Sequence, residues 1–261
     1  MSSFALQIGV DEAGRGPLFG RVYAAAVLLD PEMSLVGIKD SKKFSSAARL
    51  AETAARVKRD AWAWGIGYET EDTIDRVNIL KATQRAMHAA LDMLFASLAE
   101  RRRQEGKEGE KEEEIGRTVC VLVDGDHFER YMIPGEELTP LASELIPKGD
   151  AKLAQIAAAS ILAKHARDTY IGHLCVAYPA LETYYRIGTC KGYATKAHMD
   201  AVARYGPTIF HRLSFQRVKE YVAVPPSVPP PAELASVLHT PPLPLTVPAL
   251  TSVCVSSSLV T

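Results

Sequence analysis

The chain has 261 residues, 47% of them hydrophobic, and its 30 Lys and Arg against 31 Asp and Glu give a formal net charge of −1. This length suffices to bury a sizeable core as one large domain or two small ones, and the composition excludes wholesale disorder, collagen and a disulfide scaffold. A net charge near zero gives no support to a strongly basic nucleic-acid binder, but it can conceal an uneven distribution along the chain.

Hydrophobic patterning predicts an α/β domain. Short apolar runs predict strands, and alanine-rich or periodic segments predict helices. The predicted strands span residues 5–10, 22–29, 61–68 and 119–123, and the predicted helices span residues 45–59, 70–100, 151–175 and 195–204. Three opening strands followed by helix and strand in alternation indicate a mixed sheet.

Two segments differ in composition from the rest. Residues 101–117 are almost entirely charged, with six basic and six acidic side chains, and indicate either a solvated helix extension or a mobile insertion. Residues 223–261 hold nine of the 16 prolines and one charged residue, Glu233, which predicts an extended, disordered tail. We therefore expect one folded domain over residues 1–222, followed by a tail that could dock on a partner or be dispensable.

No feature of the sequence indicates a membrane or secretory protein. No stretch approaches the roughly 20 apolar residues of a membrane helix, and the N-terminus lacks a basic region followed by a long apolar run. The cysteines are Cys120, Cys175, Cys190 and Cys254. They show no C-x-x-C spacing and indicate reduced thiols of an intracellular protein, so the expected location is the cytoplasm.

Acidic residues follow two of the predicted strands. Asp11 and Glu12 come directly after the first strand, and Asp124 comes after the continuously apolar run VCVLV. An aspartate at the end of an apolar strand is costly to bury unless it is paired or binds a cation. If the two strands are neighbours and the first ends at Val10, the three carboxylates meet at one edge of the sheet. Asp150 is a fourth candidate, at the start of the predicted long helix.

Each of these acids alone has an ordinary structural explanation. Asp150 could cap a helix, Asp124 could form a turn with Gly125, and Asp11 could begin the glycine-rich loop that follows it. Together they suit a hard cation, because carboxylate oxygens hold Mg²⁺ or Mn²⁺ and no His/Cys set suggests zinc. Two such ions can support an in-line phosphoryl displacement.

Backbone and side-chain groups of other residues could contact a phosphate-containing substrate. Gly14, Arg15 and Gly16 do not form a P-loop, since G-x-x-x-x-G-K-[ST] is absent, but they let the backbone approach a substrate closely. Arg15 could contact phosphate or simply pack against its neighbours. Tyr193 lies between two lysines and could stack on a sugar or base.

Three lysines are weaker candidates. Lys42 and Lys43 could contact phosphate or form only a solvated pair, and Lys164 could do so or pair with Asp168 one helical turn away. The charge distribution favours a phosphate partner: residues 1–147 hold 19 basic and 25 acidic side chains, and residues 148–222 hold 11 basic and five acidic. Binding to nucleic acid should therefore weaken modestly as salt rises.

Several motifs together resemble ribonuclease HII, the type 2 ribonuclease H. They are DEAGRGPLFG, DSKK, DRVNILKAT, VLVDGD, KGDAK, AAASILAKHARD, KGYATKAH and GPTIFHRLSF. They occur in the family's order and spacing over about residues 7–219 and are most similar to the bacterial single-chain form. Ordered motifs over most of a chain are a far more specific signal than a lone G-x-G.

The resemblance implies a ribonuclease H-like α/β fold, with a mixed central sheet flanked by helices, a C-terminal helical portion and then the disordered tail. It implies a metal-dependent endoribonuclease that needs Mg²⁺ or Mn²⁺ and cleaves RNA in RNA–DNA hybrids. It also implies incision 5′ to ribonucleotides embedded in duplex DNA, by two-metal hydrolysis that leaves 5′-phosphate and 3′-hydroxyl ends. We expect the enzyme to be a monomer.

The resemblance also implies roles for individual residues. The metal-holding catalytic carboxylates would be Asp11, Glu12, Asp124 and Asp150. The substrate-binding residues would be Gly14, Arg15 and Gly16 at the ribose 2′-hydroxyl, Tyr193 at the ribonucleotide–deoxyribonucleotide junction, and Lys42, Lys43 and Lys164 at phosphates.

The sequence departs from the family's pattern at two positions. Cys190 stands where histidine is often found and Ala194 where glycine is usual, and neither change touches a carboxylate, so we expect activity to survive.

The residues themselves leave three other functions open: a DNA-cutting nuclease of the same fold such as a resolvase, a catalytically silent nucleic-acid-binding subunit, and a small-molecule phosphohydrolase.

Overall fold

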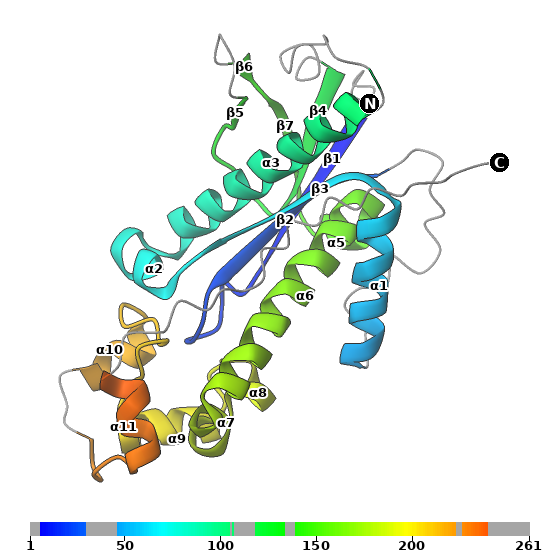
Figure 1. Ribbon diagram of the computed structural model, residues 1–261. Helices are drawn as coiled ribbons and strands as arrows, with labels where there is room; N and C mark the ends of the chain where they lie inside the picture. The colour runs from blue at the N-terminus through cyan, green and yellow to red at the C-terminus, as the bar shows by residue number, and fades with distance from the viewer. Residues whose placement is uncertain are drawn as a thin grey trace.

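The structure is a computed structural model that describes residues 6–29, 46–104, 106, 118–133, 139–222 and 226–239. A central sheet runs through the molecule, with a long helix on each face and a group of short helices at one end (Figure 1). In the described part of the chain, no helix is both long and apolar enough to cross a membrane.

The central sheet has five strands in the order β3-β2-β1-β4-β7. They are β1 (Leu6–Ala13), β2 (Val22–Leu29), β3 (Ala61–Glu69), β4 (Val119–Asp124) and β7 (Ala142–Ile146). β1, β2 and β3 pair antiparallel, whereas β1 with β4 and β4 with β7 pair parallel, which confirms the predicted mixed sheet. Sequence patterning missed β7, because this edge strand is short and largely exposed and so lacks a clear apolar run. The short strands β5 (Met132–Ile133) and β6 (Thr139–Pro140) form a separate pair.

The helices flank the sheet and then gather at one end of it. They are α1 (Ala47–Asp60), α2 (Glu71–Val77), α3 (Ile79–Gln104), α5 (Gly149–Lys152), α6 (Ala154–Ala177), α7 (Pro179–Tyr185), α8 (Ile187–Cys190), α9 (Lys196–Tyr205), α10 (Gln216–Val222) and α11 (Ala232–His239). Figure 1 shows α3 on one face of the sheet, α6 and α1 on the other, and α7 to α11 together at one end, as the expected C-terminal helical portion.

Two predicted helices are each divided in the structure. The predicted helix 70–100 is broken at Asn78, whose φ of 70° lies in the left-handed region that asparagine tolerates better than most residues. The predicted helix 151–175 begins as α5 and restarts as α6, because Leu153 between them is extended, with φ −119° and ψ 131°. The second break sets the short helix that carries Asp150 apart from α6.

The all-buried strand β2 separates two hydrophobic cores. Ala24, Ala26 and Leu28 pack on the side of α3, and Ala25 and Val27 pack on the side of α6 and α1. This alternation follows from the two-residue period of a strand, and a strand with both faces covered is continuously apolar.

The two segments of unusual composition are partly structured. Residues 101–104 continue α3, as the helix-extension prediction requires, and residues 107–117 lie outside the described residues. The prediction of an extended tail is wrong for α11, where Leu234 and Val237 are buried and the helix packs on α7. A helix forms here because no proline interrupts it between Pro231 and its end. Residues 240–261 lie outside the described part of the tail.

At Gly9 the central strand β1 lies against the backbone of α6 with no room for a side chain. A Cβ at Gly9 would lie 2.1 Å from the backbone carbonyl carbon of Gln155 and 2.4 Å from the backbone nitrogen of Ile156. We expect Gly9→Ala to lower the free energy of unfolding by about 3 kcal/mol, because backbone atoms must shift to admit the methyl group. Gly172→Ala is the matched control on α6: nothing lies within 4 Å of its added Cβ, so better helix propensity should raise stability by up to about 1 kcal/mol. Denaturant unfolding measures both, and equal values for the two variants would contradict this account of the packing.

Candidate active site

The acidic residues lie where strands β1 and β4 separate. The two strands pair in parallel up to the partners Val10 and Val123. Beyond them, β1 continues beside β2 as far as Ala13, and β4 continues beside β7 as far as Asp124. The prediction that β1 ends at Val10 is therefore wrong, but the two strands do part there. The acids therefore lie at the carboxyl ends of two parallel strands that part, the place at which α/β sheets commonly bind ligands.

Asp11 is the most deeply placed acid on β1, with 5% of its surface exposed. Its Oδ1 accepts a hydrogen bond from the backbone N–H of Glu12 at 2.7 Å, and its side chain also meets the Ser160 hydroxyl on α6. Burial raises the pKa of Asp11 well above its usual value, and the negative charges of Glu12 and Asp124 raise it further. The three carboxyl groups are thus close enough to repel one another.

Glu12 is the more exposed acid on β1 and already has a cationic partner. Arg15 Nη1 lies 3.2 Å from Glu12 Oε1, with 46% and 17% of the two side chains exposed. Burial raises the pKa of Glu12, Arg15 opposes this shift, and Asp124 adds to it. Of the two expected roles of Arg15, the structure shows the contact with its neighbour.

The other two acids are held near the end of β4. Asp124 Oδ1 accepts a hydrogen bond from the backbone N–H of Gly149 at 2.7 Å, which ties the end of β4 to the start of α5. Asp150 is the next residue and is 2% exposed. It does not cap α5, because the N-cap is Lys148, in a left-handed conformation with φ 57°. The helix-cap explanation of Asp150 is therefore wrong.

The chemistry of this acidic group fits a divalent cation. Asp11, Glu12, Asp124 and Asp150 offer only carboxylate oxygens, the donors that Mg²⁺ and Mn²⁺ prefer. Among the residues that the structure describes, no group of three or more His, Cys, Asp or Glu side chains is arranged to hold a metal ion. A cation bound here would relieve the repulsion that raises the pKa of Asp11, so the acids fit a metal site although they do not form a closed ligand set.

The glycine loop, residues 14–20, adjoins the acids and also reaches Tyr193. A Cβ at Gly16 would lie 3.7 Å from Tyr193 Cε1, and the Leu18 N–H donates to the Gly192 carbonyl at 2.9 Å. Tyr193 is 52% exposed, an unusual state for so large an aromatic side chain. The structure thus brings together the predicted glycine loop, the predicted aromatic and the acids of β1.

Of the three lysines predicted to contact phosphate, the structure describes only Lys164. Lys164 Nζ lies 2.8 Å from Asp168 Oδ2, so the ion pair expected as one of its two explanations is present. Lys42 and Lys43 lie outside the described residues.

Two histidines that the sequence analysis did not single out support the backbone of Tyr193. His198 Nδ1 lies 2.9 Å from the Tyr193 carbonyl oxygen, which can only accept, so this nitrogen carries a proton. His211 Nδ1 accepts from the Thr208 N–H at 2.9 Å, so the proton of His211 is on Nε2. His211 Nε2 then donates to His198 Nε2, 3.0 Å away. This chain of hydrogen bonds requires both rings to be neutral.

The histidine pair predicts a loss of stability in mild acid. Burial lowers the pKa of both rings, and for His211 the neighbouring His198 adds to the effect. Below about pH 6.5, the ordinary histidine pKa, the unfolded chain therefore binds protons that the folded chain does not. The stabilisation is fully present above that pH and is lost as the pH falls toward the lowered values. We expect the free energy of unfolding to fall by about 1–3 kcal/mol between pH 7.5 and 5.5 through these two rings.

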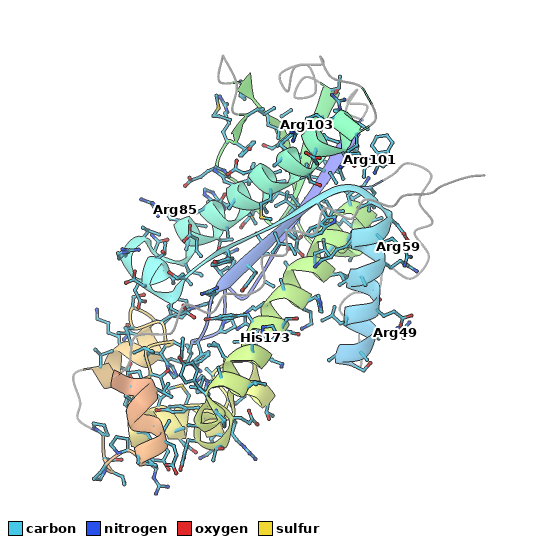
Figure 2. All side chains as sticks on the ribbon, in the orientation of Figure 1. Arg49, Arg59, Arg85, Arg101, Arg103 and His173 are labelled. Carbon is cyan, nitrogen blue, oxygen red and sulfur yellow. The ribbon has the colours of Figure 1, made fainter. Side chains whose placement is uncertain are left out.

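Denaturant unfolding at the two pH values measures this effect. In His211→Gln the free energy of unfolding should differ less between the two pH values than in the unaltered protein, whatever the stability of the variant itself. His173→Gln is the control, because His173 is exposed on α6 (Figure 2), and it should leave the difference as in the unaltered protein. If the free energy of unfolding of His211→Gln changes with pH as much as that of the unaltered protein, the histidine pair does not cause the loss of stability in mild acid.

Comparison with known sequences gives one consistent family. The family model described as Ribonuclease HII matches residues 8–103 and 107–218. The chain is 40% identical over 215 residues to a ribonuclease HII of Chromobacterium violaceum, covering 82% of this chain and 92% of that protein. It is 43% identical over 208 residues to a ribonuclease HII of Moorella thermoacetica, covering 80% and 85%.

Solved structures agree on the fold. The ribonuclease H2 of Pyrococcus horikoshii OT3 matches with a TM-score of 0.58 and 20% identity, covering 83% of this chain and 96% of that one. Bst-RNase HIII in complex with Mn²⁺ matches with a TM-score of 0.61 and 18% identity, covering 84% and 70%. The mixed sheet flanked by helices is thus a ribonuclease H-like fold, as expected. The chain therefore belongs to the ribonuclease HII family and is an endoribonuclease of the ribonuclease H type.

Proposed function

We propose that this enzyme hydrolyses RNA in RNA–DNA hybrids and incises 5′ to single ribonucleotides embedded in duplex DNA. The products would carry 5′-phosphate and 3′-hydroxyl ends. The observation that supports this best is the continuity of the site: the acids of β1 run directly into the glycine loop, which is hydrogen-bonded to the segment that carries Tyr193. A phosphodiester at the acids would thus lie beside groups suited to a sugar and a base.

The acids would hold the cofactor. Asp11, Glu12, Asp124 and Asp150 would bind two Mg²⁺ or Mn²⁺ ions, which when bound supply a Lewis acid and lower the pKa of water. Mn²⁺ is present in the structure of Bst-RNase HIII, a protein of the same fold. Because Glu12 is paired with Arg15 here, Arg15 would offset the charge of Glu12 until the cations bind, and could then turn to a phosphate.

The rest of the site would select the substrate. The glycine loop would contact the ribose 2′-hydroxyl, the chemical group that distinguishes a ribonucleotide in a DNA strand. Tyr193 is exposed enough to stack on a sugar or base at the junction. Lys42, Lys43 and Lys164 would contact phosphates, for Lys164 by exchanging its pair with Asp168. We place this activity in residues 1–222, acting as a monomer.

An oligonucleotide assay tests the proposal. Four duplexes of one sequence are compared with and without Mg²⁺ or Mn²⁺: DNA with one ribonucleotide, an RNA–DNA hybrid, all-DNA, and all-RNA. We expect metal-dependent cleavage of the first two only, with product ends mapped by their response to a phosphatase and a ligase. Cleavage of the all-DNA duplex would favour a DNA-cutting nuclease, and binding without cleavage would favour a silent subunit.

A further inference from the structure

A buried arginine, Arg212, holds the glycine loop from inside the protein. Its side chain is fully buried (0% exposed) in the segment between α9 and α10. Its guanidinium donates to four backbone carbonyls, all of them in the glycine loop. The contacts are Nη2 to Gly14 at 2.6 Å, Nη1 to Pro17 at 2.7 Å and to Arg15 at 3.0 Å, and Nε to Gly20 at 2.8 Å.

These contacts determine where the backbone N–H groups of the loop point. In a planar trans peptide, the carbonyl of one residue and the N–H of the next point in opposite directions. Because the carbonyls of Gly14 and Arg15 point toward Arg212, the N–H groups of Arg15 and Gly16 point away from it. Arg15 and Gly16 are exposed, and neither N–H donates a hydrogen bond within the part of the chain that the structure describes.

The same reasoning accounts for a bond that is observed. The Pro17 carbonyl points toward Arg212, so the N–H of Leu18 must point away, and this N–H donates to the Gly192 carbonyl at 2.9 Å. That bond joins the glycine loop to the segment that carries Tyr193. The outward N–H groups of Arg15 and Gly16 therefore lie on the same side as the Tyr193 ring, which approaches Gly16.

Keeping a cation in this position is costly for the protein. Among the described residues, Arg212 forms no ion pair, and its positive charge is satisfied by neutral carbonyls. Burial and the charge of Arg167 together lower the pKa of Arg212 to about 9, although Glu71 and Asp75 oppose the shift. A buried ion that contributes little net stability is consistent with a role in fixing one conformation.

We propose that Arg212 is a positioning residue that aims the N–H groups of Arg15 and Gly16 at the sugar of the bound nucleic acid. Consecutive outward N–H groups form a concavity that can donate hydrogen bonds to an oxygen atom, here the ribose 2′-hydroxyl oxygen. Only the five N–H groups of a guanidinium, fixed in one plane, can reach four carbonyls at once. The inference rests on the proposed function, in which the glycine loop reads the ribose.

The test compares Arg212→Met and Arg212→Lys with Arg217→Met, a change at an exposed arginine on α10. Binding is measured in an Asp124→Asn background, which leaves the duplex intact, with two DNA duplexes that differ by one 2′-hydroxyl. We expect the background protein to prefer the ribonucleotide duplex at least tenfold and Arg212→Met to bind both alike. Arg212→Lys should fall between, because an ammonium has three N–H groups for four carbonyls, and Arg217→Met should keep the full preference.

Two further measurements separate positioning from folding. With Asp124 intact, kcat/KM on the ribonucleotide duplex should fall at least 100-fold in Arg212→Met at a temperature where circular dichroism shows it folded. The NMR resonances of the Arg15 and Gly16 amides should shift in Arg212→Lys, which keeps the positive charge. This measurement still tests the inference if Arg212→Met does not fold.

The possible failures are distinguishable. A folded Arg212→Met that keeps the preference for the ribonucleotide duplex, or unchanged Arg15 and Gly16 amide resonances in Arg212→Lys, would overturn the inference. If the background protein has no preference, the proposed function fails, and the amide resonances still decide whether Arg212 orients the loop.

Discussion

Replacing Asp11 by Asn is expected to make the protein more stable without divalent metal and inactive with it. The Asp11 carboxylate is 5% exposed, and burial and the charges of Glu12 and Asp124 all raise its pKa. At pH 7 its ionisation therefore costs stability, which a neutral side chain of the same shape recovers. We expect a gain of about 1 kcal/mol in EDTA and a loss of cleavage of about 1,000-fold or more with Mg²⁺ or Mn²⁺.

Thermal unfolding with and without metal measures the linked effect. Metal that binds only the folded state raises the melting temperature of the unaltered protein, and Asp11→Asn should lose most of that rise. Asp200→Asn is the control, because Asp200 forms only an exposed pair with Lys196 on α9, and it should resemble the unaltered protein throughout. A variant that still cleaves normally, or that is destabilised in EDTA, would show that Asp11 has a structural role instead.

Replacing either of two glycines in the glycine loop by alanine should reduce activity, for a different reason in each case. Gly14 has φ +98°, and a Cβ there would lie 2.3 Å from Arg167 Nε and 2.5 Å from Arg167 Cδ. Gly14→Ala should therefore lose about 2–4 kcal/mol of folding free energy as well as activity. Gly16 has no positive φ, and its added Cβ meets only Tyr193 Cε1, at 3.7 Å. Gly16→Ala should fold within about 0.5 kcal/mol of the unaltered protein.

The functional loss in Gly16→Ala should come from the substrate side. A methyl group at Gly16 would occupy the exposed surface beside Tyr193, where the backbone must approach the nucleic acid. We expect a fall of about 100-fold in kcat/KM, through loss of a contact worth about 3 kcal/mol in the transition state. Steady-state kinetics and denaturant unfolding on both variants separate the two effects. Normal activity in Gly16→Ala would exclude a close approach of substrate to this loop.

The sequence predicted the strands better than the helices. Continuous apolar runs such as VCVLV are typical of strands covered on both faces, and every strand predicted in this way is present. The helix breaks at Asn78 and Leu153 were missed, since neither residue is a strong breaker. Asn78 Oδ1 accepts from the Lys81 N–H at the start of α3, and Leu153 is extended between α5 and α6. α11 was missed because the proline content of the whole tail concealed a proline-free window.

The site was predictable where it follows the chain and unpredictable where it depends on burial. Asp11 and Asp124 come directly after apolar runs of sequence, and the parallel pairing of β1 with β4 brings them together as expected. Arg167, His198 and Arg212 were not singled out, because in the sequence they resemble any surface polar residue. For Arg167 and Arg212 the burial becomes visible only when residues about 150 to 200 positions apart in the chain are in contact, as Arg212 and Gly14 are.

The sequence by itself determined four of the five strands of the central sheet, the acidic residues directly after two apolar runs and the family to which the chain belongs. These features are local, since an apolar run, a carboxylate at its end and a motif are each read from neighbouring residues. Only the tertiary structure decided that Glu12 pairs with Arg15, that Asp150 is buried and not a helix cap, and that Arg212 holds the glycine loop. Hydrogen bonds and burial join residues distant in the chain, and no local pattern records them.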